Sequence, residues 1–311
     1  MPALPPLLVI AGATATGKTV LAVRLADELW GRGVAAEIIS ADSRQVYRGL
    51  DIGTAKVGRQ DRARIPHHGL DLVDPDAPFS VADFVDHASA SLAGIAGRGG
   101  LAILVGGTGL YLRAIARGLD TEALPSDAVV RARIEDELDV HGVAAAGARL
   151  ATLAPGIAAR TDLRNPRRVA RALEIAELRG DAPLPAPRGY DGPVDWIGLT
   201  VEPATQRRWI AERARAQFEA GLIDEARALR ERFDPSLPAF SAIGYGEAWA
   251  VLDGRLTGEA AIAADAARNV AFAKRQRTWF RAEPGVEWLD VTDSDPLPGA
   301  RTAADRLLGR A

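Results

Sequence analysis

The sequence contains no cysteine, which excludes both a disulfide framework and a metal site built on thiolates. Four histidines, His67, His68, His87 and His141, offer little for a zinc cluster, so a bound metal is expected to have oxygen ligands. No apolar run approaches the roughly 20 residues of a bilayer span, and the first residues lack the basic region of a signal peptide. These absences predict a cytoplasmic protein without a membrane segment.

Lysine is also scarce, because Lys18, Lys56 and Lys274 are the only lysines among 38 basic residues. Where arginine supplies the generic positive charge, a lysine marks a position that needs a compact point charge. The net charge of −3 decides nothing about nucleic acid, but residues 160–171 and 268–281 form two locally basic segments. Each segment is either a nucleic-acid contact or an ordinary solvated helix face.

Apolar runs alternate with amphipathic stretches over most of the chain, which predicts an α/β fold with a parallel sheet and right-handed crossovers. Strands are expected at residues 7–12, 36–40, 67–75, 101–107, 196–202 and 287–291. Helices are expected at residues 18–30, 79–97, 204–218, 221–233, 241–253 and 258–282.

Residues 119–180 show helical patterns with no strand between them, and a proline-rich linker at 181–195 follows. This change of pattern predicts an inserted all-helical domain at 119–193. The α/β core is then expected to consist of residues 1–118 and 194–311.

A phosphate-binding pattern, G-x-x-x-x-G-K-[ST], is formed by Gly12, Gly17, Lys18 and Thr19 between the first strand and the first helix. In this context the glycines let successive backbone N–H groups converge on phosphate oxygens, and the lysine adds a mobile charge. The threonine hydroxyl can bind Mg²⁺. The pattern predicts a P-loop NTPase-like sheet flanked by helices, and a strand-helix turn without a ligand is the alternative.

The acid that usually holds Mg²⁺ at the end of a neighbouring strand is missing, because the strand at 101–105 runs into Gly106, Gly107, Thr108 and Gly109. Asp42, after the strand at 36–40, is the nearest carboxylate in the pattern. Asp74 is a weaker candidate, and a helix cap is the alternative role for Asp42.

Seven segments together resemble the tRNA dimethylallyltransferase family, also called tRNA isopentenyltransferases. They are GATATGKT, ISADSRQVYRGLDIGTAK, HHGLDLVDP, GGTGLYLRA, RNPRRVARALEI, SAIGYGE and AKRQRTWFR. They occur in order from residue 12 to residue 281, and the second segment has little generic character. No cysteine-histidine zinc extension follows Arg281, so a bacterial type is expected.

The resemblance implies transfer of a dimethylallyl group from dimethylallyl diphosphate to the exocyclic N6 of the adenine directly 3′ of the anticodon in tRNA, with release of diphosphate. It implies that Asp42 is the base, that Lys18, Thr19 and Arg213 are catalytic, and that Mg²⁺ is bound through Thr19. The loop expected to hold the diphosphate consists of Gly12, Ala13, Thr14, Ala15, Thr16, Gly17, Lys18 and Thr19.

The resemblance also implies contacts with the tRNA anticodon stem-loop by a monomeric enzyme. The residues expected to make them are Asp42, Ser43, Arg44, Gln45, Thr108, Arg167, Arg168, Arg171, Lys274, Arg275 and Gln276. For Ser43 and Gln45 an ordinary turn is the alternative, and for Arg213 a surface salt bridge with Glu219 or Glu225. Lys56 either contacts RNA phosphate or holds a loop.

Several residues differ from the family pattern, and three other functions stay open. The differing residues are Ala13, Thr16, Trp209, Gly246, Val270 and Phe272. The changes at Trp209, Gly246 and Val270 remove positive charge, and the change at Phe272 removes a hydroxyl, from helices expected to face RNA. A small-molecule kinase with residues 160–171 as its lid is one alternative. Prenylation of free AMP and a non-enzymatic RNA-binding module are the others.

Overall fold

The computed structural model describes residues 4–120, 124–183 and 186–310. The chain forms two compact units: a core unit, Met1–Gly118 with Gly189–Ala311, and an insertion unit, Leu119–Arg188. The chain returns to the core at Gly189 and not at residue 194, because Gly189 N–H donates to the Arg117 carbonyl and the Tyr190 hydroxyl to the Pro5 carbonyl. Residues 121–123 and 184–185 of the expected insertion lie outside the described residues.

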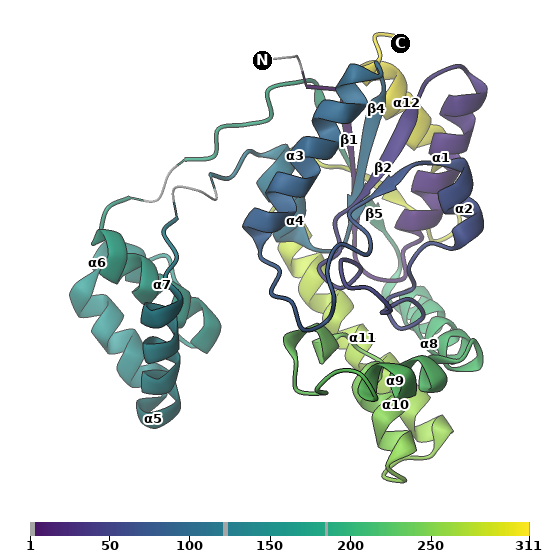
Figure 1. The fold of residues 1–311 in the computed structure, drawn as a ribbon. Coiled ribbons are helices and arrows are strands. Elements are labelled where there is room, and N and C mark those ends of the chain that lie inside the picture. The colour runs from purple at the N-terminus through teal and green to yellow at the C-terminus, as the bar shows by residue number, and fades with distance from the viewer. Residues whose placement is uncertain (1–3, 121–123, 184–185, 311) are drawn as a thin grey trace. The chain divides into compact units, whose positions relative to one another are not determined.

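The core unit contains a six-stranded sheet in the order β3-β2-β4-β1-β5-β6, in which every pairing is parallel (Figure 1). The α/β class is therefore confirmed. The expected strand at 67–75 is wrong in length, because Gly69 and Asp71 have φ angles of 80° and 55° and turn the chain out of the sheet. The strands are β1 (Leu7–Gly12), β2 (Ala36–Ser40), β3 (His67–His68), β4 (Leu101–Gly106), β5 (Val194–Thr200) and β6 (Glu287–Asp290).

Helices cover both faces of this sheet, so β1 is buried along its whole length. Leu8 and Ile10 of β1 belong to an apolar cluster with α1 (Lys18–Gly31) and α12 (Leu297–Leu307). Leu7 and Val9 belong to a cluster with α3 (Val81–Gly97) and α4 (Gly109–Ala116) on the other face. Among the described α-helices of the core unit, three were not predicted from the sequence patterns: α4, α12 and the short α2 (Arg59–Arg64).

Further helices lie beyond the carboxyl ends of the strands (Figure 1). They are α8 (Pro203–Glu219), α9 (Leu222–Arg230), the 3₁₀ helix η1 (Pro238–Ser241), α10 (Tyr245–Leu252) and α11 (Gly258–Arg281). Val46, Tyr47 and Leu50 from the loop after β2 share an apolar cluster with α9 and α10. This packing places the loop after β2 and the helices α8 and α11 around one end of the sheet, where α/β folds bind ligands.

The insertion unit is built from α5 (Ala128–Leu153), α6 (Pro155–Ala158) and α7 (Pro166–Arg179), with no strand among its described residues. Its own apolar core includes Ile134, Leu150 and Leu173. In the described part of both units, no helix combines the length and the apolar composition that crossing a bilayer requires.

Candidate active site

The glycine loop, residues 12–19, forms a nest of backbone N–H groups between β1 and α1. Gly12 and Gly17 have φ angles of 151° and 79°, and Ala15 adopts the same left-handed region at 59°. A Cβ at Gly12 would also lie 2.9 Å from the carbonyl oxygen of Leu199. From Ala15 to Thr19, no backbone N–H has an acceptor among the described residues. Such a row of free donors at a helix N-terminus binds anions.

Two cations bind to neighbouring residues of this loop. Lys18 Nζ donates to the carbonyl of Ala13 at 2.7 Å, and Arg213 Nη1 donates to the hydroxyl of Thr14 at 3.1 Å. Burial and the guanidinium of Arg213 lower the pKa of Lys18 to about 7, against the opposing effect of Asp42. Burial also lowers the pKa of Arg213, while Asp42 raises it. Lys18, Arg213 and Asp42 are thus one electrostatic cluster, in which an added anion would restore the lysine charge.

Asp42 lies in the turn after β2, and hydrogen bonds connect this turn to the turn after β4. Its Oδ1 accepts the N–H of Arg44 at 2.8 Å, and Ser43 N–H donates to the Thr108 hydroxyl at 3.0 Å. Thr108 N–H donates in turn to the Ala41 carbonyl at 3.2 Å. Oδ2 of Asp42 has no protein partner in the described residues, so it can accept a proton or a hydrogen bond from a ligand.

The absence of an acid at the end of β4 has a steric cause. A Cβ at Gly106 would lie 2.1 Å from the Ala41 carbonyl oxygen, and one at Gly109 would lie 2.3 Å from the Trp279 ring of α11. The end of β4 therefore packs against the turn after β2 and against α11 too closely for a carboxylate side chain at these positions. Of the two carboxylates considered from the sequence, Asp74 pairs with Arg48, and Asp42 is the one coupled electrostatically to Lys18.

The residues at the loop fit Mg²⁺ that is held mainly by a diphosphate. Thr19 is the second residue of α1, its side chain is exposed, and its hydroxyl has no partner among the described residues. The same residues contain no group of three histidine or carboxylate side chains placed for a protein-only metal site. Mg²⁺ keeps several waters and commonly binds through one or two protein ligands and phosphate oxygens, which agrees with this donor set.

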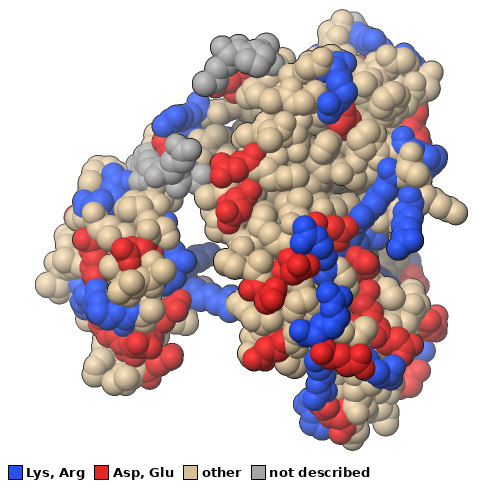
Figure 2. Space-filling view, in the orientation of Figure 1, with Lys and Arg blue, Asp and Glu red and all other residues tan. Residues whose placement is uncertain are grey.

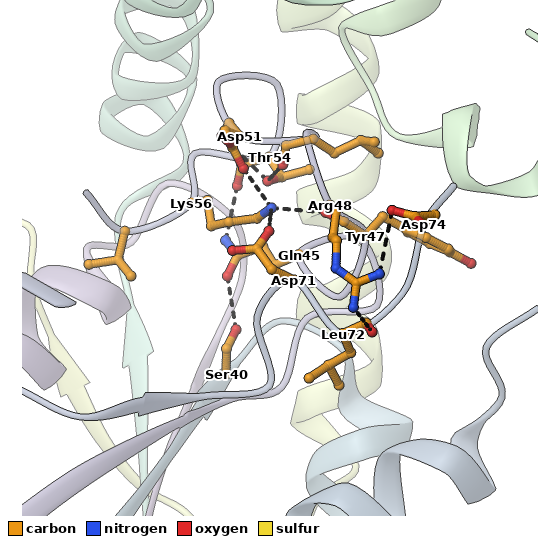
Figure 3. A network of polar contacts seen from close by, with 12 residues as sticks. Ser40, Gln45, Tyr47, Arg48, Asp51, Thr54, Lys56, Asp71, Leu72 and Asp74 are labelled. Carbon is orange, nitrogen blue, oxygen red and sulfur yellow. Dashed lines mark hydrogen bonds and ion pairs between the residues drawn. The ribbon is translucent and has the colours of Figure 1, made fainter. Parts of the chain in front are cut away.

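Lys56 holds the loop after β2, and Figure 3 shows its contacts. Its side chain is only 2% exposed, and its ammonium group pairs with Asp51 at 2.7 Å and Asp71 at 2.6 Å and donates to the Tyr47 carbonyl at 2.9 Å. Asp71 has a left-handed backbone and pairs with Arg62 as well. Of the two roles left open for Lys56, the structure supports holding the loop.

Arg213 has none of the salt bridges proposed as its alternative role. Glu225 accepts the N–H groups of Ile52 and Gly53 at 2.8 and 3.1 Å and the hydroxyl of Tyr245 at 2.7 Å. No ion pair joins Arg213 to Glu219 or Glu225 within the described residues. Arg213, from α8, therefore contacts the glycine loop through Thr14.

Four sequence predictions need correction, because the side chains or amides are already used inside the protein. The Thr14 N–H donates to Gln276 Oε1 at 2.7 Å, so neither group faces a ligand. Gln45 accepts from the Ser40 hydroxyl and donates to the Thr54 carbonyl, which makes it a turn residue. Arg171 donates to the carboxylate of the buried Glu174 and to the carbonyls of Leu124 and Pro125.

Four of the five remaining basic candidates are exposed, and Arg44 is half-buried. Arg167 and Arg168 lie in the first turn of α7, and Lys274 and Arg275 lie near the end of α11. Arg44 donates to the Pro238 carbonyl. Basic and acidic side chains are interspersed on the visible face of each unit in Figure 2. These four exposed cations are consequently the ones available for phosphate contacts.

Most of the residues on the helices that differ from the family pattern pack against neighbouring side chains. Trp209 packs against the apolar cluster under α1, and Val270 packs against Ala13 and Ile210. The Phe272 ring lies below the Arg275 guanidinium, 5.7 Å from its central carbon. Gly246 has open space beside it, with Arg268 as its nearest neighbour at 3.8 Å from an added Cβ.

Comparison with known proteins identifies the family. The model of a family described as IPP transferase matches residues 45–283. The chain is 43% identical over 310 residues to the tRNA dimethylallyltransferase of Symbiobacterium thermophilum, covering 97% of this chain and 95% of that one. The chain belongs to the IPP transferase family. Within that family it is also 46% identical over 288 residues to the tRNA dimethylallyltransferase of an Anaeromyxobacter species, covering 91% and 92% of the two chains.

Solved IPP transferases share the fold. The full-length tRNA isopentenylpyrophosphate transferase of Bacillus halodurans is 40% identical, with a TM-score of 0.70 and coverage of 98% and 96%. A eukaryotic dimethylallyltransferase crystallised acting on tRNA has a TM-score of 0.79 at 24% identity, which shows the shared fold alone. The predicted family and fold class are confirmed.

The sequence analysis did not single out Gln206 and Glu225 as residues of the site, and it covered Arg277 only as part of the basic segment 268–281. Gln206 donates to the Thr14 carbonyl, Arg277 donates to Gln206, and Glu225 caps the loop after β2. Arg277 lies in the AKRQRTWFR segment, so that motif carried a signal for it. Gln206 and Glu225 lie in ordinary amphipathic helices, and no local pattern in the sequence singles them out.

Proposed function

We propose that this protein transfers the dimethylallyl group of dimethylallyl diphosphate to N6 of the adenine directly 3′ of the anticodon in tRNA. The observation that carries the proposal is the cluster of Lys18, Arg213 and Asp42 at a glycine loop whose free N–H groups suit a diphosphate. The names of the relatives, tRNA dimethylallyltransferase, agree with it.

The loop's task is to stabilise a departing diphosphate. As the bond between the allylic carbon and the diphosphate oxygen breaks, the electron pair stays on that oxygen and negative charge grows there. The N–H groups of Ala15–Thr19 have no protein acceptor among the described residues, and Lys18 and Arg213 contact neighbouring residues of the same loop. Together they can stabilise this charge, and such electrostatic stabilisation is usually the largest single contribution to catalysis. Bound Mg²⁺, with Thr19 as its protein ligand, would neutralise part of the diphosphate charge.

Asp42 acts on the acceptor. The adenine N6 uses its lone pair to form the new carbon–nitrogen bond and must lose one proton. The unpartnered Oδ2 of Asp42 accepts a hydrogen bond from N6, orients the amine and takes that proton. Arg44 N–H holds Oδ1 and so fixes the orientation of the carboxylate.

An adenine stacked in an anticodon loop has to leave the stack to reach a carboxylate beside a glycine loop. Thr108 and Ser43, which are hydrogen-bonded to each other, lie next to Asp42 and suit contacts with the displaced base. Arg167, Arg168, Lys274 and Arg275 supply phosphate contacts to the anticodon stem-loop. We propose that one chain is sufficient for the reaction.

The decisive experiment incubates the protein and Mg²⁺ with labelled dimethylallyl diphosphate and total tRNA, followed by digestion to nucleosides. Label is expected in N6-dimethylallyladenosine, and a parallel ribonuclease digest to oligonucleotides is expected to place it in the fragment that contains the adenine after the anticodon. Parallel reactions contain AMP as acceptor, or ATP as donor to a panel of small alcohols and nucleosides. Label in AMP with none in tRNA, or phosphoryl transfer with no prenyl transfer, would replace this proposal by one of the two alternative enzymes.

A further inference from the structure

Side chains from two helices hold both backbone polar groups of Thr14. The Thr14 N–H donates to Gln276 Oε1 of α11 at 2.7 Å, and the Thr14 carbonyl accepts from Gln206 Nε2 of α8 at 2.9 Å. Gln206 is 2% exposed and Gln276 is 7% exposed, so water does not compete for these bonds. The two amides thus fix the backbone on both sides of one residue in the middle of the glycine loop.

A second partner determines which end of each amide faces Thr14. Gln276 Nε2 donates to the Gly107 carbonyl at 2.9 Å, which leaves its oxygen for the Thr14 N–H. Arg277 Nη1 donates to Gln206 Oε1 at 2.6 Å, which leaves the nitrogen for the Thr14 carbonyl. An amide has one donor end and one acceptor end, so no carboxylate or hydrocarbon side chain satisfies either pair.

The sequence makes room for this arrangement. A Cβ at Gly107 would lie 2.3 Å from Gln276 Nε2, so a glycine at 107 is what lets the glutamine reach the loop. The hydroxyl of Thr14 is occupied as well, by Arg213. The N–H, the carbonyl and the hydroxyl oxygen of Thr14 therefore each have a protein partner, whereas the backbone N–H groups of Ala15–Thr19 have none among the described residues.

The backbone changes conformation directly after Thr14. Ala15 has a φ of 59°, a left-handed conformation that is unfavourable for a residue with a Cβ. Such strain persists only where the surroundings fix the backbone. The free N–H groups that converge on a ligand begin at this residue, so the hold on Thr14 decides where they point.

We propose that Gln206 and Gln276 are positioning residues of the donor site, which grip Thr14 and so shape the N–H nest of Ala15–Thr19 for a diphosphate. The inference rests on the proposed function for the identity of the ligand. Neither glutamine touches the ligand, and both act through the loop. Their loss weakens binding of the diphosphate in the ground state and also weakens stabilisation of the charge that grows on it in the transition state, because the nest holds the diphosphate in both.

The test compares Gln206→Met and Gln276→Met with the unchanged protein and with Gln60→Met, whose side chain is exposed on α2. Calorimetry with inorganic diphosphate and Mg²⁺ measures the donor site without any reaction. Each clamp variant is expected to raise the Kd for diphosphate about tenfold or more, while Gln60→Met leaves it unchanged. The KM for dimethylallyl diphosphate should rise and kcat should fall, so that kcat/KM drops by at least the factor by which the diphosphate affinity drops.

Gln206→Glu provides a second variant in case a methionine prevents folding. A glutamate keeps an oxygen for Arg277 but has no donor for the Thr14 carbonyl, so it opens the same clamp and should also weaken diphosphate binding. A fall in Tm with diphosphate affinity unchanged would reduce both glutamines to a structural role and overturn the inference. Failure of the unchanged protein to bind diphosphate would instead refute the proposed function.

Discussion

Lys18 folds back over its own loop, and its ammonium nitrogen lies 2.7 Å from the carbonyl oxygen of Ala13. In this position the charge is removed from water beside Arg213, so the lysine pKa falls to about 7. A diphosphate in the nest would place negative charge next to the ammonium group and raise the pKa again. Binding of the donor and protonation of Lys18 are therefore linked.

The first prediction is that diphosphate binding takes up a proton in a pH-dependent way. At a pH of about 8.5, Lys18 is mostly neutral without ligand and charged with it, so uptake approaches about one proton. At a pH of about 6 the lysine is already charged, and uptake by it falls toward zero. Binding enthalpies of diphosphate with Mg²⁺, measured in buffers of different ionisation enthalpy, report this number.

Lys18→Met is the control for that measurement, because the ligand's own protonation is common to both proteins. The difference in uptake between the two proteins belongs to the lysine. An equal uptake in the variant at high pH would show that Lys18 does not change its protonation when diphosphate binds, and would refute the linkage. The variant should also bind diphosphate more weakly while keeping its affinity for RNA.

The second prediction concerns Asp42→Asn. The asparagine oxygen can still accept the Arg44 N–H, so the turn after β2 survives, but the amide accepts no proton from N6. Single-turnover prenyl transfer is expected to slow by about 10²–10³. Diphosphate affinity should not fall, since a negative charge beside the nest has been removed. An unchanged transfer rate would remove Asp42 from the role of base.

The third prediction separates Lys56 from Lys274, one buried and one exposed lysine. Lys56→Met should lower the free energy of unfolding by about 2 kcal/mol, because Asp71 loses one partner and keeps Arg62. It should slow prenyl transfer and leave RNA affinity unchanged. Lys274→Met should do the reverse: weaken RNA binding, reduce the salt slope by about one and leave stability unchanged.

Denaturant unfolding and filter binding at several salt concentrations distinguish the two lysines. If Lys56→Met lost RNA affinity and a unit of salt slope at unchanged stability, Lys56 would be a phosphate contact. In that case the network of Figure 3 would be only a resting position of its side chain.

The sequence allowed prediction of the parts whose signals are local. The eight-residue glycine pattern at 12–19 and the apolar runs on either side of it predicted a strand, a loop and a helix in succession. The strand at 7–12 and the helix from Lys18 occur where expected. The strand at 67–75 was overestimated because Asp71, a residue with a Cβ, adopts a left-handed conformation held by Lys56 and Arg62. No local pattern announces such a turn.

The hydrogen-bond partners of the side chains at the site could not be predicted, because they depend on contacts between residues that are distant in the sequence. Gln276 lies 262 residues from Thr14 in the sequence, and Gln206 lies 192 residues from it. From the motif AKRQRTWFR, the sequence analysis predicted a polar and basic helix that contacts RNA. In the structure some side chains of this motif are exposed and others are buried. Lys274 and Arg275 face outward, while Gln276 faces the glycine loop.

The fourth prediction divides the arginines of α7. Arg167 and Arg168 are exposed, so changing both to glutamine should weaken RNA binding, reduce its salt slope by up to about two and leave diphosphate affinity unchanged. Arg171 instead pairs with Glu174, whose side chain is fully buried. Burial alone would raise the pKa of Glu174, but hydrogen bonds from Arg171, the Asp127 amide and Arg131 outweigh it and lower the pKa.

Arg171→Gln removes one of those partners and should lower the free energy of unfolding of the insertion unit by about 2–3 kcal/mol. At temperatures where the unit stays folded, the salt slope of RNA binding should equal that of the unchanged protein, because Arg171 neutralises a carboxylate and not a phosphate. Filter binding between about 50 and 200 mM salt measures the slope. A slope reduced in Arg171→Gln and unchanged in the double variant would place the phosphate contact on the wrong side of α7 and reverse this assignment.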